Sequence, residues 1–220
     1  MTPPPRPLVK LCGLKTPDAV EAALCHGADW LGLVHFPKSP RHVTLETARA
    51  LAEPARGRVG IVLLLVDPDD RLVSAAMEQL SPDLVQLHGR ESPARTRAVR
   101  EQAGRPVIKA VGVSGREDLE AARGYVGIAD HILLDAKPPK GVDLPGGNGA
   151  VFDWSVLTAP GPGFPFILSG GLTPENVSEA IDRAHPFGVD VSSGLEAAPG
   201  VKDPARIAAF MDAVRPAGTE

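Results

Sequence analysis

Eight short apolar runs alternate along the chain with longer segments that have the spacing of amphipathic helices. The runs are rich in Val, Ile and Leu without strict alternation, which is typical of parallel strands covered on both faces. We predict strands over residues 7–13, 29–35, 58–66, 83–89, 106–113, 131–137, 165–171 and 187–194. The helical segments are residues 16–28, 44–55, 67–83, 91–104, 115–127, 173–185 and 202–216, with a further short helix expected within 151–159.

Eight strands that are each followed by a helix predict an α/β fold of the (β/α)8 type, the TIM barrel, rather than an open doubly wound sheet. No linker separates two cores, so we expect one domain over residues 1–220 with loose ends at 1–6 and 216–220. Thr16 and Pro17 have the residue types of a helix start. The irregular segment 136–149 follows the sixth strand and is predicted to be a lid or a substrate-binding loop.

Composition narrows the class of protein. A formal net charge of −4 argues against a nucleic-acid-binding surface, which needs clustered basic residues. No stretch reaches the roughly 18–20 apolar residues of a membrane helix, and the start of the chain lacks the features of a signal peptide. Cys12 and Cys25 do not form a disulfide framework. These features favour a cytoplasmic enzyme.

Polar residues and glycines gather where the predicted strands end, which is the end that carries the active site in barrels of this kind. Two loops are rich in glycine and serine, and barrels often bind phosphate on the loops after strands seven and eight. Tight turns are the alternative explanation for these glycines. The candidate phosphate-binding residues are Gly170, Gly171, Ser192, Ser193 and Gly194.

Two strand ends carry groups that could transfer protons. Cys12 ends the first strand, where it is either a small buried hydrophobe or a general base with a lowered pKa. Asp135 ends the apolar run of the sixth strand. It is either a general acid at the mouth of the barrel or one member of a salt bridge with Lys109 or Lys137.

Other polar side chains near the strand ends are candidates for substrate contacts. Arg41 lies in a loop stiffened by Pro37 and Pro40, and its guanidinium suits a carboxylate, although an exposed and solvated arginine is the commoner case. Gln86 and His88 have the character of hydrogen-bond partners within the structure or of ligand contacts. The remaining histidines are scattered and do not have the spacing of metal ligands, so we expect no metal site.

Taken together, these segments resemble the phosphoribosylanthranilate isomerase family over residues from Lys10 to about Arg215. The resemblance is specific because several motifs occur in order and at the right spacing. They are KLCG at 10–13, GADWLGLVHFPKSPR at 27–41, VQLHG at 85–89, LLDAK at 133–137, FILSGGLTPENV at 166–177 and GVDVSSGLE at 188–196. One departure is GGNG at 146–149, where the family usually has Gly-Gly-Thr-Gly.

The resemblance implies an Amadori rearrangement of phosphoribosylanthranilate in tryptophan biosynthesis, carried out by a monomer or homodimer without metal or other cofactor. In that family the residue matching Cys12 is the general base and the residue matching Asp135 is the general acid. The residue matching Arg41 binds the anthranilate carboxylate, and Asp190 matches an aspartate that orders the site. We also expect Gln86, His88 and Asp190 to be substrate-binding residues.

Two alternatives remain beside this interpretation. A related isomerase of histidine biosynthesis performs the same rearrangement. That family is expected to use a pair of aspartates as acid and base, whereas the first strand here carries Cys12. A barrel that binds a phosphosugar without catalysis is the other alternative, and the presence of both Cys12 and Asp135 argues against it.

Overall fold

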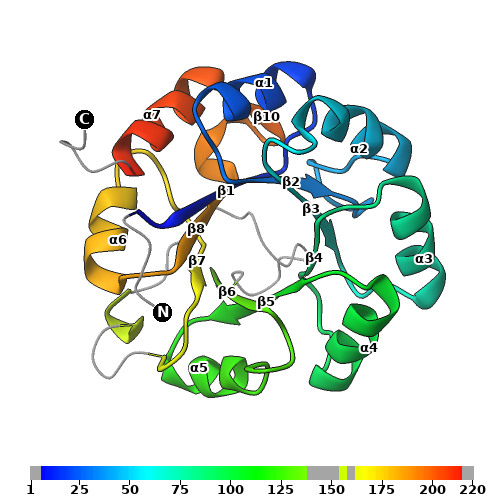
Figure 1. Cartoon of the computed structure of the whole chain (residues 1–220). Helices are drawn as coiled ribbons and strands as arrows, with labels where there is room; N and C mark the ends of the chain where they lie inside the picture. Colours follow the sequence, from blue (N-terminus) through cyan, green and yellow to red (C-terminus); the bar gives the residue numbers. More distant parts are fainter. Residues whose placement is uncertain (1–5, 138–153, 158–161, 215–220) are drawn as a thin grey trace.

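The computed structural model describes residues 6–137, 154–157 and 162–214, in which eight parallel strands close into one barrel (Figure 1). The predicted TIM-barrel fold is confirmed. Each strand pairs with the next along the chain, and β8 returns to β1 with Lys10 opposite Asp190. The strands are β1 (Leu8–Cys12), β2 (Trp30–Val34), β3 (Gly60–Leu65), β4 (Leu84–Leu87), β5 (Val107–Val113), β6 (His131–Ala136), β7 (Ile167–Leu168) and β8 (Gly188–Val191).

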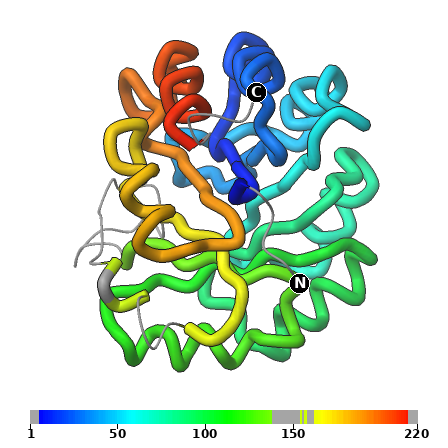
Figure 2. Tube along the Cα trace, turned by 60° about the vertical axis from the view of Figure 1, so that its left-hand side comes forward, coloured from blue at the N-terminus to red at the C-terminus, as the bar shows by residue number. Residues whose placement is uncertain are grey.

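The helices form a ring around the barrel, and their ends follow the local sequence. Thr16 caps α1 by accepting a hydrogen bond from the Ala19 amide at 3.3 Å, and Pro17 occupies the first turn, as predicted. Last and first helices pack side by side, which completes the ring (Figures 1 and 2). The helices are α1 (Pro17–Cys25), α2 (Leu45–Ala52), α3 (Asp70–Gln79), α4 (Pro93–Ala103), α5 (Arg116–Arg123), α6 (Val177–Ala184) and α7 (Pro204–Val214).

Two segments differ from the sequence prediction. Within the short helix predicted over 151–159, the described residues Trp154–Leu157 form the 3-10 turn η2. Only a short apolar run is available there before the Pro-Gly-Pro-Gly sequence at 160–163, which does not extend a helix. Arg6, predicted to belong to a loose end, is held by two hydrogen bonds to Asp29 at 2.7 and 2.9 Å because its planar donors match the carboxylate. Residues 138–149 of the predicted lid and the ends 1–5 and 215–220 lie outside the described residues.

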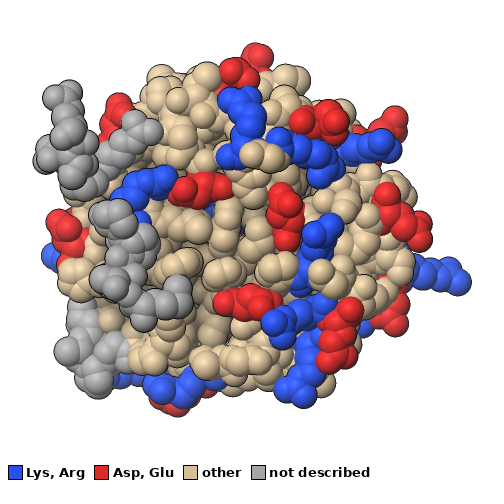
Figure 3. All heavy atoms as spheres, in the orientation of Figure 1, with Lys and Arg blue, Asp and Glu red and all other residues tan. Residues whose placement is uncertain are grey.

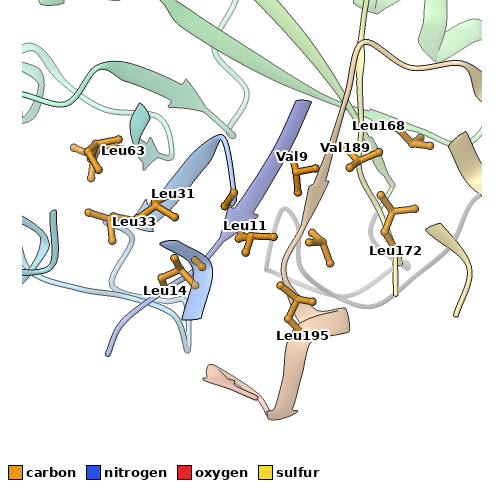
Figure 4. Packing of buried hydrophobic residues seen from close by; sticks show 14 of the residues in the cluster. Val9, Leu11, Leu14, Leu31, Leu33, Leu63, Leu168, Leu172, Val189 and Leu195 are labelled. Carbon is orange, nitrogen blue, oxygen red and sulfur yellow. The ribbon is translucent and has the colours of Figure 1, made fainter. Parts of the chain in front are cut away.

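Alternation along the strands divides the core into two parts. Odd-numbered residues of β1 and β2, such as Val9, Leu11, Leu31 and Leu33, belong to the large buried cluster that also contains side chains of the helices (Figure 4). Side chains on the opposite face of the strands fill the interior of the barrel. The buried cluster there comprises Val62, Leu84, Ile108, Ala110, Leu133 and Ile167. Because side chains two apart on a strand share a face, Gln86 follows Leu84, and Asp135 follows Leu133, on the inner face of the barrel.

Candidate active site

The carboxyl ends of the parallel strands meet at one rim of the barrel, and the predicted proton-transfer residues lie there. Cys12 is the last residue of β1 and Asp135 the last but one of β6. Asp190 lies in β8 and Gln86 in β4, with His88 directly after that strand. The fold therefore brings the ends of four separate strands, and the candidate residues on them, to one rim of the barrel.

Asp135 is buried, and its partner is a histidine. His88 Nε2 lies 3.2 Å from Asp135 Oδ2, and the Ala136 amide donates to Oδ1 at 3.0 Å. The Gln86 amide Nε2 lies 3.0 Å from His88 Nδ1. With Gln86 donating to Nδ1, the His88 proton is on Nε2 and faces the carboxylate. A chain of hydrogen bonds from β4 thus orients the carboxyl group.

The salt bridges considered for Asp135 are not formed, because both lysines have other partners. Lys109 Nζ lies 2.6 Å from Glu91 Oε2 in a buried pair, and Lys137 Nζ lies 2.6 Å from Asp118 Oδ1 nearer the surface. The interpretation of Asp135 as a member of a lysine ion pair is therefore wrong. Glu91 also accepts from the backbone amide of Gly89, so the Lys109 pair holds the loop that carries His88.

Cys12 is a free thiol, and only 4% of its surface is exposed. Burial raises the pKa of this thiol, while the Lys10 ammonium acts in the opposite direction. Lys10 itself is fully buried and pairs with Asp190, with 2.8 Å between Nζ and Oδ1. The backbone oxygen of Cys12 accepts from Ser192 Oγ at 3.1 Å, so the loop after β8 is tied to the end of β1.

Arg41 is buried with 6% exposure, so the expectation of a solvated arginine is wrong. Its Nε and Nη2 donate to the two oxygens of Glu196 at 2.7 and 2.9 Å. Lys202 Nζ reaches the same carboxylate at 2.7 Å. Two cations therefore share one carboxylate in a buried group. Arg41 also packs on Gly13, since a Cβ there would lie 2.6 Å from Arg41 Cδ.

Glu196 and Lys202 are among the residues that sequence reasoning missed, as is Lys10. Glu196 and Lys202 belong to a small hairpin after β8, formed by β9 (Glu196–Ala198) and β10 (Val201–Lys202). Glu196 closes the GVDVSSGLE motif, which was the available signal, but no local pattern connects it with Arg41.

The loops after β7 and β8 pack against one another and against the end of β6. Gly170 has a φ of +89°, and a Cβ there would collide with Ala136. Gly194 approaches the backbone oxygen of Leu172 so closely that a side chain could not fit. Gly171, Ser192 and Ser193 complete this pair of loops, which lies beside both Cys12 and Asp135. The glycines therefore have a packing role whether or not the loops bind phosphate.

A cavity of about 440 Å³ lies at the opposite end of the barrel, at the start of β6, β7 and β8. It is lined mainly by apolar side chains such as Phe164, Phe187 and Ile132. Burial lowers the pKa of His131 in its wall, so that histidine favours the neutral form. The cavity contains none of the strand-end residues and is separate from the candidate site.

Residues 6–137, 154–157 and 162–214 include no cluster of three or more His, Cys, Asp or Glu that could hold a metal ion. None of the helices in these ranges is long and apolar enough to cross a membrane. On the face shown in Figure 3, acidic and basic side chains are interspersed.

The fold and the rim define an α/β-barrel enzyme with a thiol and a carboxyl group at its catalytic end. A family model described as N-(5'-phosphoribosyl)anthranilate (PRA) isomerase matches residues 9–213. The chain belongs to this family.

Relatives and solved structures match the chain over nearly its whole length. N-(5'-phosphoribosyl)anthranilate isomerase from Azorhizobium caulinodans is 55% identical over 209 residues, which is 95% of this chain and 92% of that protein. The crystal structure of the Thermotoga maritima enzyme has a TM-score of 0.85 at 37% identity, with 94% and 98% of the two chains covered. A phosphoribosyl anthranilate isomerase in complex with reduced 1-(o-carboxyphenylamino)-1-deoxyribulose 5-phosphate has a TM-score of 0.82 at 36% identity, with the same coverage.

Proposed function

We propose that this protein isomerises N-(5-phosphoribosyl)anthranilate to 1-(2-carboxyphenylamino)-1-deoxyribulose 5-phosphate in tryptophan biosynthesis. The observation that carries the proposal is the placement of Cys12 and Asp135 on the ends of β1 and β6, at the same rim of the barrel. An Amadori rearrangement needs one group that donates a proton and one that accepts a proton from carbon. The family relationship supplies the substrate.

Asp135 is the general acid in this proposal. It protonates the ribose ring oxygen while the C1′–O4′ bond breaks, and the nitrogen lone pair forms the C1′=N bond of a Schiff base. The carboxylate that remains is stabilised by the N–H groups of His88 and Ala136, which already point at its two oxygens. Gln86 sets the orientation of His88, so we assign both residues to the support of the acid as well as to contact with the sugar.

Cys12 is the general base in this proposal. Its thiolate removes the proton from C2′, and the C–H electron pair forms the C1′=C2′ bond as the C1′=N pair returns to nitrogen. The resulting enolamine tautomerises to the ketone product. Protons alone move, so the reaction requires no redox cofactor and no metal.

Arg41 binds the anthranilate carboxylate in this proposal, and the planar guanidinium, which Glu196 orients by two hydrogen bonds, supports this role. Asp190 orders the site through Lys10. The phosphate lies on Gly170, Gly171, Ser192, Ser193 and Gly194, because backbone amides in such loops attract anions. We further propose a cytoplasmic enzyme that acts as a monomer or homodimer on a small-molecule phosphosugar, with no nucleic-acid or membrane partner.

The function is tested by following the fluorescence of freshly made phosphoribosylanthranilate with purified protein and no added metal or nucleotide. We expect substrate fluorescence to disappear with saturable kinetics. A folded protein that binds the product analogue but leaves the substrate unchanged would support a binding barrel instead. Faster turnover of the related aminoaldose of histidine biosynthesis would support the other isomerase.

Glu196→Gln should weaken substrate binding more than it slows the chemical step. The neutral amide loses half of the two-pronged contact with Arg41 and leaves two buried cations with no carboxylate. Displacement of the guanidinium should raise KM by at least about tenfold, since a charged hydrogen bond contributes roughly 1.5–3 kcal/mol. Glu179→Gln, in an exposed pair with Arg183, is the matched control and should leave KM unchanged. An unchanged KM in the Glu196 variant would remove this glutamate from substrate binding.

A further inference from the structure

Lys10 is fully buried, and it lies two residues before Cys12 on the inner face of β1. Among the described residues its ion-pair partner is Asp190, which faces it across the β1–β8 seam with 2.8 Å between Nζ and Oδ1. Removing two such charges from water costs several kcal/mol, and well-packed apolar residues often stabilise a core as well or better. Stability alone is therefore a weak explanation for a charged pair at this position.

The ammonium and the thiol approach the same point in the barrel. Gly32 of β2 lies opposite Cys12, and a Cβ on this glycine would lie 2.9 Å from Cys12 Sγ and 3.0 Å from Lys10 Nζ. Any side chain at residue 32 would push both atoms away. The absence of a side chain at Gly32 thus leaves the space in which the lysine and the cysteine meet.

The charged groups around the thiol come from four elements. Lys10 belongs to β1, Asp190 to β8 and Lys202 to β10, and Arg41 packs on the adjacent Gly13 from the loop after β2. Burial raises the pKa of Cys12 most, Lys10 lowers it, Asp190 raises it and Lys202 lowers it. Burial also opposes the charge on Lys10, but Asp190 and Cys12 hold the pKa of Lys10 above its ordinary value. The ammonium is therefore a permanent charge beside the thiol.

We propose that Lys10 is the positioning residue that allows Cys12 to act as a base, because its ammonium stabilises the thiolate inside the barrel. Asp190 pairs with the ammonium and competes with the thiolate for it. Lys10 transfers no proton: the C2′ proton passes to Sγ, and the lysine stays protonated before and after this step. The inference rests on the proposed function for its catalytic meaning, whereas the coupling of the two side chains is a property of the unliganded protein.

The test is an NMR titration of protein labelled with ¹³C at the cysteine Cβ, in a Cys25→Ser background so that Cys12 alone is observed. Lys10→Met should raise the pKa of the Cys12 thiol, since it removes the neighbouring cation. Asp190→Asn should lower it, because the carboxylate that competes for the ammonium is gone. A residue that serves only stability would not move the thiol in opposite directions in these two variants.

An unchanged or lowered thiol pKa in Lys10→Met would overturn the proposal. If that variant does not fold, as judged by circular dichroism, Asp190→Asn decides alone, and an unchanged or raised thiol pKa in Asp190→Asn then overturns the proposal.

In kinetics, Lys10→Met should lose at least about tenfold in kcat/KM at neutral pH and recover part of this loss as pH rises, because the thiolate fraction changes about tenfold per pKa unit. Should Cys12→Ala retain turnover, the proposed base fails while the titration still reports on the coupling.

Discussion

Cys12→Ala should lose about 10²- to 10⁴-fold in kcat, the usual contribution of a general base. The Sγ atom is the only basic group that this position offers to C2′, and alanine removes it with little change in volume. KM should change little, because Arg41 and Gly170, which are proposed to bind the anionic groups of the substrate, are untouched. The measurement is steady-state turnover by substrate fluorescence, with thermal unfolding to verify the fold.

Cys25→Ala is the matched control for this substitution. Cys25 is an exposed cysteine at the end of α1, with its side chain hydrogen-bonded to Glu21 at 3.2 Å. This variant should have the kcat of the unmodified protein. Near-normal kcat in Cys12→Ala, with the control also normal, would show that another group accepts the proton.

Asp135→Asn should reduce kcat by a similar factor of about 10²–10⁴ while retaining affinity for the reduced product analogue. Asparagine has nearly the same shape and keeps one oxygen, which can accept from one of the two N–H groups of His88 and Ala136, but its amide cannot supply a proton to the ring oxygen. Binding by calorimetry and turnover by fluorescence separate the two effects.

Asp130→Asn provides the comparison at the opposite end of the same strand. Asp130 pairs with Arg100 at 2.7 Å, just before β6, and the substitution should leave kcat unchanged even where it lowers stability. If Asp135→Asn instead unfolds the protein and the part that remains folded turns over normally, Asp135 is a structural residue.

The barrel could be predicted in outline because each strand and helix is encoded locally. An apolar run, a helix cap such as Thr16 and a glycine-rich strand end can each be recognised within a segment of a few residues. The family motifs then place Cys12 and Asp135 on their strands. The choice between general acid and salt bridge for Asp135 could not be made in the same way, since either fits a carboxyl group at the end of an apolar run.

What the sequence determined by itself is the order of the elements and the chemical groups at their ends. The tertiary structure alone decided which of those groups meet: Lys10 with Asp190 across 180 residues, Arg41 with Glu196 across 155, and Asp135 with His88 instead of a lysine. The reason is physical. Closure of the barrel joins the first strand to the last, so these contacts depend on the packing of the whole chain. Contacts of this kind produce no local pattern in the sequence.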